Sequence, residues 1–302
     1  MKPATPLNPT QQDYARRILR VLLHIQRHLD EPLALDELAE MAHFSRFHFH
    51  RVFRGMVGEP VKEHVRRLRL ERAARQLETT SEAVVQIALG AGYEAHAAFT
   101  RAFRARFGVS PSEYREGRRE AREPRSGVPL TGAGEQLRFQ TLFQEASAMD
   151  ARIESRDPLR VAFLRHTGPY EEAGATWGQL CAFAAPRGLL GPDAVMFGAS
   201  YDDPEVTPKD KIRYDACLVV PESFEPEGPV GVQEIRGGDY AVTMLKGPYS
   251  GLSALYGQLL GQWLPAQGRE PEPDAPFLEF CKNDPNETPP EQLETEVCVP
   301  LR

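Results

Sequence analysis

A cluster of basic and aromatic side chains occurs twice in the first half of the chain, fifty residues apart. Four residues are identical in the two copies: Phe49 and Phe99, Arg51 and Arg101, Phe53 and Phe103, Arg54 and Arg104. Arginine can bind guanine O6 and N7 with two hydrogen bonds, histidine can hydrogen-bond a base or a phosphate, and phenylalanine or alanine can contact a thymine methyl group. The repeat predicts contact with a long polyanion at two places, and DNA is the natural candidate.

Helical spacing sorts each copy into two faces. From Arg46 to Gly55, an apolar face is expected to pack into the core; it comprises Phe49, Val52, Phe53 and Met56. The first reading face is Phe47, His50, Arg51 and Arg54, with Arg46 at the helix start, where base edges are usually approached. The second reading face is Ala97, Thr100, Arg101 and Arg104, with His96 near the start. Two alternatives stay open: the arginines solvate amphipathic helices, or Arg51 and Arg101 pair with a neighbouring acid.

The elements that must position these faces also repeat. A short helix near Asp36, a turn at His43-Phe44 and a capping Ser45 precede the first copy. Ile87-Ala88, the turn Gly92-Tyr93 and a helix over 95–107 form the corresponding second set. A longer helix, from Pro60 to about Leu77, connects the two sets. The sequence therefore predicts two complete helix-turn-helix units.

Composition limits the class of protein. The 302 residues allow about two domains, and no run of 18 apolar residues suggests a membrane span. Residues 1–125 carry a net charge of +6, whereas residues 126–302 carry −13, so we expect nucleic-acid contact in the first half. The polar, proline-rich residues 1–12 do not resemble a signal peptide, and the four cysteines form no CxxC pair; both features favour a cytoplasmic protein with reduced thiols.

We predict no metal site and no cofactor. His48 and His50 could suggest metal binding, but residues at i and i+2 of a helix point to different faces. No acid or cysteine beside them completes a set of ligands.

The first half resembles the AraC-type transcription regulators over residues 12–118. The motifs that carry the resemblance are Ile87-Ala88, Gly92-Tyr93, Phe99 to Arg104, Gly108 to Pro111, and Tyr114-Arg115. One departure is Ala95, where the family often has a small hydroxyl residue. The resemblance implies that both reading helices enter successive major grooves on one face of DNA, about 34 Å apart.

The second half has a different pattern. A charged, then Gly- and Pro-rich connection is expected over 119–148, followed by strand-like runs such as 161–164, 214–220 and 240–244. An internal repeat is visible here as well: Gly168-Pro169-Tyr170 and Gly247-Pro248-Tyr249 are 79 residues apart, and 203–208 corresponds to 284–289. Each copy predicts a hairpin, a helix and two more strands. We therefore expect one α+β domain over 149–302, made of two pseudo-symmetric repeats with a cleft between them.

The second half resembles the GyrI-like effector-binding domains over about 150–302. Tyr201 to Pro204, Tyr214 to Cys217 and 277–280 followed by 282–285 carry this resemblance, including a glutamate, Glu279, on a central strand. The order of the two domains resembles the Rob-like arrangement of regulators. Glu279 aligns with Gly198 in the internal repeat, so its carboxylate lies on one side of the pseudo-symmetry only. A desolvated carboxylate beside aromatic rings attracts a lipophilic cation. The expected aromatic walls of this ligand site are Tyr170, Trp177, Tyr214, Tyr249, Tyr256, Trp263 and Phe277.

Together these features predict a sequence-specific DNA-binding transcription regulator whose second domain senses a small lipophilic or cationic molecule. Double-stranded DNA, the effector and RNA polymerase are the expected partners, without a membrane. Two alternatives for the second domain stay open. It can be a hydrolase of reactive small molecules in which Glu279 and tyrosines activate water, or an acidic module that contacts a protein such as gyrase or polymerase.

Overall fold

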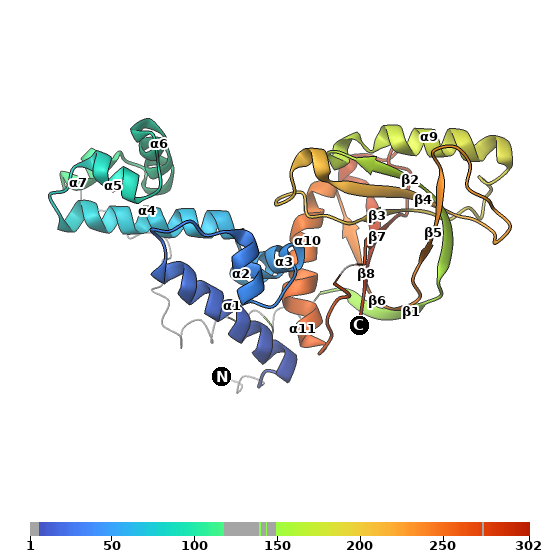
Figure 1. Ribbon diagram of the computed structural model, residues 1–302, viewed down its shortest axis with the longest axis horizontal. Helices are drawn as coiled ribbons and strands as arrows, with labels where there is room; N and C mark the ends of the chain where they lie inside the picture. Colours follow the sequence, from blue (N-terminus) through green and yellow to red (C-terminus); the bar gives the residue numbers. More distant parts are fainter. Residues whose placement is uncertain (1–5, 118–138, 140–142, 144–148, 274) are drawn as a thin grey trace.

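The computed structural model describes residues 6–117, 139, 143, 149–273 and 275–302. The predicted connection over 119–148 lies outside the described residues, apart from Phe139 and Phe143. The first half is helical: α1 (Pro9–Arg27), α2 (Leu35–Met41), α3 (Arg46–Val57), α4 (Val61–Thr79), α5 (Val84–Gly90), α6 (His96–Phe107) and α7 (Pro111–Arg115). Figure 1 shows the two helix-turn-helix units at opposite ends of the long helix α4.

Local sequence explains where these helices begin and end. Asn8 begins α1 with a capping box, in which its side chain accepts a hydrogen bond from the backbone of Gln11 at 2.9 Å. The two reading helices end alike, because Gly58 and Gly108 both adopt the left-handed backbone, at φ 89° and 82°. The predicted capping role of Ser45 is wrong in part. Ser45 stands at the N-cap position of α3, but its side chain makes no capping hydrogen bond.

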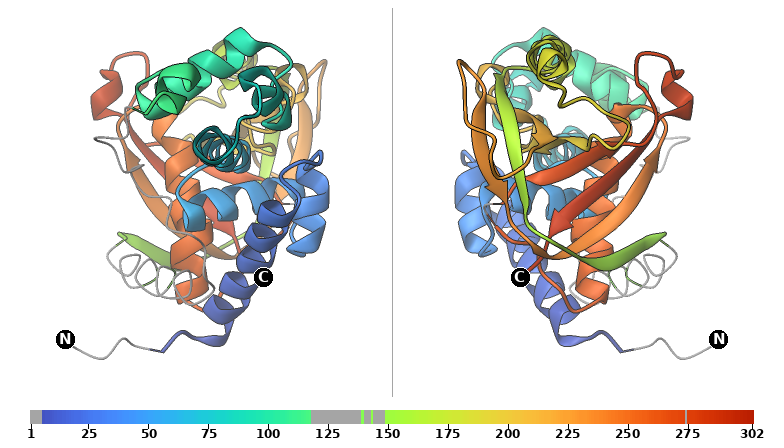
Figure 2. Two further views of the ribbon diagram at one scale, coloured as in Figure 1. Left: turned by 90° about the vertical axis from the view of Figure 1, so that its left-hand side faces the viewer. Right: turned by 90° about the vertical axis from the view of Figure 1, so that its right-hand side faces the viewer.

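The second half forms one curled sheet of eight strands, a half-barrel that Figure 2 shows from the side. The strands are β1 (Ala151–Arg156), β2 (Leu159–Thr167), β3 (Met196–Ser200), β4 (Arg213–Val219), β5 (Gly231–Ile235), β6 (Gly238–Lys246), β7 (Phe277–Cys281) and β8 (Glu294–Pro300). Helix α9 (Gly174–Ala184) lies in the first repeat. In the second repeat, α10 (Leu252–Gln258), the π-helical turn η5 (Leu259–Trp263) and α11 (Leu264–Ala266) follow one another directly.

The strand order confirms the predicted internal repeat. It runs β1-β6-β8-β7-β3-β4-β2-β5, and exchanging β1–β4 for β5–β8 simply reverses it. The pseudo-twofold axis therefore passes between β3 and β7, and it brings Gly198 opposite Glu279. Each repeat contains a helix and two further strands after it, as the sequence predicts. The expected hairpin is wrong, because β1 pairs with β6 and β2 pairs with β5, so the first two strands of each repeat pair across the repeats and not with each other.

Both repeat helices pack on the same face of the sheet, while the opposite face has a hydrophobic cluster of its own that includes Phe197 and Leu278. Helix α9 packs on β2 and β4. Helix α10 has a second neighbour, because α3 of the first half lies against α10 and η5 (Figure 1). One hydrophobic core thus contains Phe49 and Val52 of α3 together with Leu259 and Trp263 of η5. The second helix-turn-helix unit has a separate core around Phe99 and Phe103.

No helix among the described residues has the length and apolar character needed to cross a membrane.

Candidate functional site

The second reading face is open to solvent. His96, Ala97, Arg101 and Arg104 are exposed, and Thr100 is partly buried. The apolar side of the same helix is buried as predicted, through Phe99, Ala102 and Phe103. In this unit, the helical spacing therefore predicts correctly which side chains point outward.

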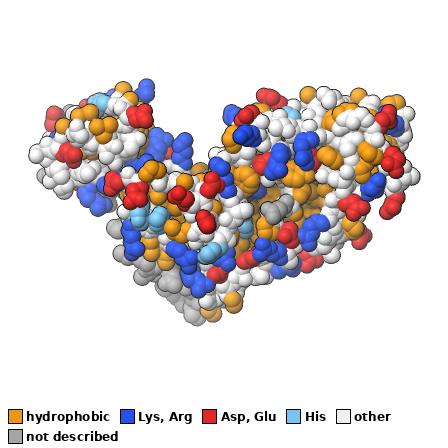
Figure 3. Space-filling model, in the orientation of Figure 1, with side chains coloured by type: hydrophobic (Ala, Val, Ile, Leu, Met, Phe, Trp, Pro, Cys, Tyr) orange, Lys and Arg blue, Asp and Glu red, His pale blue; other side chains and the backbone are white. Residues whose placement is uncertain are grey.

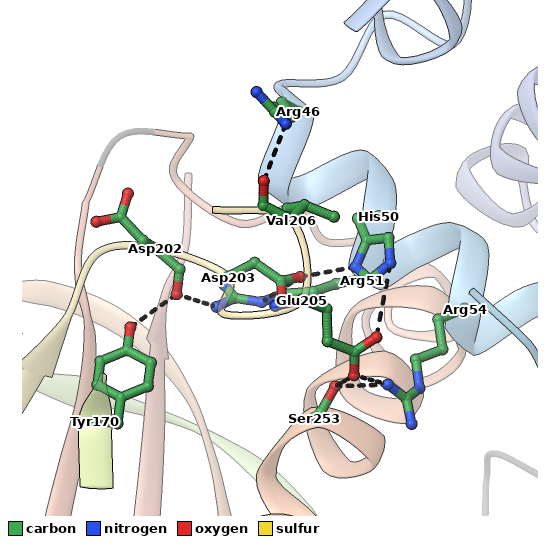
Figure 4. A network of polar contacts seen from close by, with 10 residues as sticks. All are labelled: Arg46, His50, Arg51, Arg54, Tyr170, Asp202, Asp203, Glu205, Val206 and Ser253. Carbon is green, nitrogen blue, oxygen red and sulfur yellow. Dashed lines mark hydrogen bonds and ion pairs between the residues drawn. The ribbon is translucent and has the colours of Figure 1, made fainter. Parts of the chain in front are cut away.

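The first reading face is different, because the second domain covers it. The loop Asp202–Val206 follows β3 and lies directly against α3 (Figure 4). His50 Nδ1 lies 2.9 Å from Asp203 Oδ2, and both side chains are buried. Arg54 donates to Glu205 and, at 2.8 Å, to the Ser253 hydroxyl of α10. The first reading face is therefore covered in this arrangement, and its contact with DNA stays a prediction.

Arg46 and Phe47, at the start of α3, also lie beside the second domain. Arg46 donates to the backbone oxygen of Val206 at 2.9 Å and lies 3.5 Å from Asp36 (Figure 4). Phe47 lines a cavity of about 30 Å³ that also borders Ser200 and Phe277. This cavity is far smaller than the several hundred Å³ of a drug-sized ligand pocket.

Arg51 reaches farthest into the second domain and is only 8% exposed. Its guanidinium donates to the backbone oxygen of Asp202 at 3.2 Å, and its Nε lies 3.7 Å from Asp203 Oδ2. The guanidinium carbon lies 4.6 Å from the ring centre of Phe277 and 4.9 Å from that of Tyr256. These distances are typical of cation–π contacts. The contacts of Arg51 thus include an acid, as one alternative anticipates, but the acid comes from the other domain.

Glycines allow the backbones of α3 and α10 to approach closely. A Cβ atom added to Gly55 would overlap the carbonyl oxygen of Gly257, and one added to Gly261 would lie 2.9 Å from the Val52 oxygen. Gln262 also donates to the Gly55 oxygen at 2.6 Å. The sequence reasoning missed this contact. The four-residue spacing of Gly257 and Gly261, which places both on one helix face, is the signal that could have revealed it.

Glu279 lies at the centre of the helix-covered face of the sheet. Ser200 and Tyr256 donate hydrogen bonds of 2.6 and 2.7 Å to the same carboxylate oxygen, Oε1. Burial raises the pKa of Glu279, whereas these two hydrogen bonds and the charge of Arg51 act in the opposite direction. The opposite position, Gly198, is filled by the Tyr214 hydroxyl, which a side chain there would displace. One carboxylate and one tyrosine thus occupy the two sides of the pseudo-twofold axis.

Most of the predicted aromatic walls surround this centre. Tyr256 and Phe277 contact each other, with ring centres 5.1 Å apart, and Tyr170 packs on Tyr214 at 5.7 Å. Trp177 donates to the Tyr214 hydroxyl at 3.3 Å. Tyr249 lies farther out, where its hydroxyl is 3.4 Å from the Cys281 sulfur.

Trp263 is buried in the hydrophobic core that the second domain shares with α1 and α3, and this core also contains Tyr256 and Phe277. Helix α10 and η5 have two apolar sides, one on the sheet and one on the first domain. The role of Trp263 as a wall of the ligand site stays a prediction.

A groove of about 1200 Å³ separates the second helix-turn-helix unit from the rest of the chain, as the notch in Figure 3 shows. Its basic lining comes from both units and from α4: Arg46, Lys62, Arg66, Arg69 and Arg101. Glu205 and Val206 of the second domain form part of its wall. Within the described residues, His, Cys, Asp and Glu side chains form no group of three or more that could hold a metal ion.

Comparisons with known proteins agree with this two-part organisation. Residues 149–302 match the family described as GyrI-like small molecule binding domain, and residues 38–117 match a helix-turn-helix domain family. The HTH-type transcriptional activator AarP of Providencia stuartii is 39% identical over 98 residues, which are 32% of this chain and 73% of AarP. The right origin-binding protein of Escherichia coli K12 is 35% identical over 103 residues, 34% of this chain and 36% of that protein.

The solved C-terminal domain of EcmrR is 18% identical to this chain, with a TM-score of 0.41, and the match covers 51% of this chain and 98% of that domain. The duplicated helix-turn-helix unit and the sequence matches lead to the same assignment. The chain belongs to the AraC-type helix-turn-helix transcription regulators and carries a GyrI-like small-molecule-binding domain as its second half.

Proposed function

We propose that the two reading faces bind base edges in DNA and that the Glu279 site binds an organic cation that controls this binding. The single observation that carries the proposal is the setting of Glu279. The Glu279 carboxylate accepts two hydroxyl hydrogen bonds on one oxygen and lies beside the rings of Tyr256 and Phe277. The guanidinium of Arg51 already lies over these rings. This site is built to accept positive charge next to aromatic surface.

The DNA half of the proposal is supported by the second reading face and by the basic groove. Arg101 and Arg104 are exposed on α6, and Arg101 also lines the groove with Arg66 and Arg69 of α4. A protein that neutralises several phosphates releases counterions, so its affinity falls steeply with salt. We therefore expect the arginines of α6 to contact bases and those of α4 to contact phosphates.

A pair of measurements tests the proposed function. The first selects a duplex from a random pool with the full chain and follows its affinity as a function of salt. A chain that retains no sequence preference would contradict the DNA-reading role. The second titrates tetraphenylphosphonium, a lipophilic cation, against the parent and Glu279→Gln by calorimetry. Equal affinities would remove Glu279 from the effector site.

Turnover is the alternative outcome for the second domain. The hydroxyls of Ser200 and Tyr256 are both donors to Glu279, so this arrangement orients the carboxylate as a charged acceptor. We therefore propose binding rather than catalysis. Hydrolysis of a reactive ester or epoxide that is lost in Glu279→Gln would favour the hydrolase instead.

A further inference from the structure

The same arginine takes part in both predicted sites. Arg51 belongs to the first reading face of α3, yet its guanidinium lies on Tyr256 and Phe277, the rings beside Glu279 (Figure 4 shows its polar contacts). It is 8% exposed and is held there by Asp202 and Asp203. A side chain in this position cannot contact a DNA base.

Helix α3 contacts the loop after β3 in the first repeat together with α10 in the second, whereas the pseudo-symmetric pair, the loop after β7 and α9, has no such partner among the described residues. Asp203 is buried against α3, whereas its counterpart Asp284 is exposed. Gly257 touches the backbone of α3, whereas its counterpart Gly178 has no atom within 4 Å of an added Cβ. The side that α3 contacts is also the side that carries Glu279. The carboxylate of Glu279, the small residue Gly257 and the docked helix α3 therefore lie on the same side of the pseudo-twofold axis.

The loop Asp202–Val206 offers the reading face the kinds of acceptor that DNA offers. Asp203 and Glu205 present carboxylates to His50 and Arg54, in the way that phosphates would. Backbone oxygens of Asp202 and Val206 accept from Arg51 and Arg46, in the way that base-edge acceptors would. Docking on this loop thus satisfies the polar groups of α3 while the helix is away from DNA.

We propose that Arg51 is an internal occupant of the effector site, so that an organic cation and the DNA-reading helix α3 compete for Tyr256 and Phe277. The proposal rests on the proposed function, in that it assigns the Glu279 site to cations. It also narrows the ligand to a planar cation of the guanidinium or amidinium class, which can stack on the same rings. Binding of this ligand displaces Arg51, and the freed α3 can then contact DNA.

Displacement links the two sites by thermodynamic reciprocity. If the cation raises the affinity for DNA by some factor, DNA must raise the affinity for the cation by the same factor. The remaining cavity of about 30 Å³ beside Arg51 has room for water but not for an organic cation, so the side chain must leave before a ligand can enter. Arg51 and the organic cation therefore compete for the site and cannot occupy it together.

The first test needs no DNA. Benzamidinium is titrated by calorimetry against the full-length parent, Arg51→Ala, Gly257→Leu and the matched control Gly178→Leu. Arg51→Ala removes the internal cation, and Gly257→Leu forces α3 away while keeping Arg51. Both should bind benzamidinium about tenfold more tightly than the parent, in line with the loss of a buried cation–π contact. Gly178→Leu should match the parent, and neutral benzamide should bind none of the four.

Three results of this test would overturn the proposal. One is an unchanged or weaker affinity in Arg51→Ala. Another is equal binding of benzamide and benzamidinium, and the third is the absence of benzamidinium binding in all four proteins. Glu279→Gln separates these results from a failure of the proposed function. If it binds benzamidinium as well as the parent does, the Glu279 site itself is misassigned.

The second test adds a duplex selected by the parent. Benzamidinium should tighten DNA binding by the parent, and the duplex should tighten benzamidinium binding by the same factor. The coupling should disappear in Arg51→Ala, since this variant has no internal cation to displace. Independent binding of the two ligands to the parent would refute the competition even if each ligand binds.

Discussion

Gly198 and Glu279 occupy equivalent positions in the two repeats and pair with each other at the centre of the sheet. One position holds a carboxylate, and the other holds the hydroxyl of Tyr214. A duplicated fold has thereby gained a single charge at its pseudo-twofold axis, where both repeat helices cover the sheet. This charge has consequences for stability as well as for binding.

We expect Glu279→Gln to stabilise the protein at neutral pH. Burial raises the pKa of Glu279 above its ordinary value of 4.5, so the folded chain keeps this proton to higher pH than the unfolded chain. Folding stability contributed by this group therefore falls as the pH rises above 4.5. The glutamine oxygen can still accept from Ser200 and Tyr256, since both donate to one oxygen. Thermal unfolding from pH 4 to 8 should show the stability of the variant rising relative to that of the parent as the pH increases.

Glu287→Gln, at an exposed position, provides the control for this measurement and should follow the parent at every pH. A Glu279→Gln protein whose stability relative to the parent does not change with pH would show that the carboxyl titrates normally.

Asp203→Asn should increase the affinity for DNA. It removes the charge that faces His50 and Arg51, which weakens the docking of α3 on the second domain. Asparagine keeps the side-chain oxygen that accepts from the Glu205 backbone at 3.0 Å, so the loop can retain its turn. Loss of a buried charged partner costs about 1–3 kcal/mol, so we expect the affinity for a selected duplex to rise about tenfold or more. Titration followed by fluorescence anisotropy measures this affinity.

The repeat supplies a matched control, Asp284→Asn. Asp284 accepts from the backbone of Asn286 at 2.8 Å in the same kind of turn, but it is exposed. This variant should bind DNA like the parent. Equal affinities for the two variants would mean that the Asp203 contact does not restrain α3.

Arg101→Ala should weaken binding to the selected duplex more than binding to random DNA. Arg101 is exposed on the second reading face, where a bidentate contact to guanine discriminates by about 1–3 kcal/mol. Arg16→Ala on α1, which removes an exposed arginine away from both reading faces, serves as the control. If Arg101→Ala weakens binding to both duplexes equally, the residue contacts phosphate rather than base.

Glu59→Gln should destabilise the chain at neutral pH. Burial alone would raise the pKa of Glu59, but hydrogen bonds from His64 and Arg67 overcome this effect and lower it to about 2. A carboxyl of this kind contributes stability above its ordinary value of 4.5, and the contribution is lost as the pH falls toward 2. Denaturant unfolding should show a deficit of about 1 kcal/mol at pH 7 that narrows below pH 4.5. Glu63→Gln, an exposed position in the first turn of α4, should show no such pH dependence.

Helical spacing was sufficient to predict the local structure of the reading helices. Phe49, Phe53, Phe99 and Phe103 are all fully buried, because apolar side chains three or four residues apart share one helix face. The internal repeat of the second half likewise predicted its strands and the asymmetric position of Glu279. These features depend on patterns within short segments.

Contacts between distant segments could not be predicted in this way. His50 and Asp203 are 153 positions apart, and nothing in either local pattern indicates that they meet. The packing of Trp263 against the first domain could not be predicted for a related reason. The π-helical turn Leu259–Trp263 interrupts the regular period of its helix, and that helix packs on the sheet and on α3 at once. A helix that packs on both the sheet and α3 has apolar residues on two sides, so the position of one apolar stripe does not predict which neighbour a given residue contacts.

The reading helix α3 and the surface that covers it belong to one polypeptide, and their backbones touch through Gly55 and Gly257. Docking of α3 on the second domain, which closes the molecule, is therefore a unimolecular event. Its equilibrium does not change when the protein is diluted or its expression rises. A cell containing ten copies and a cell containing a thousand would hold the same fraction of closed molecules. Only the concentrations of cation and of DNA sites would set how many open.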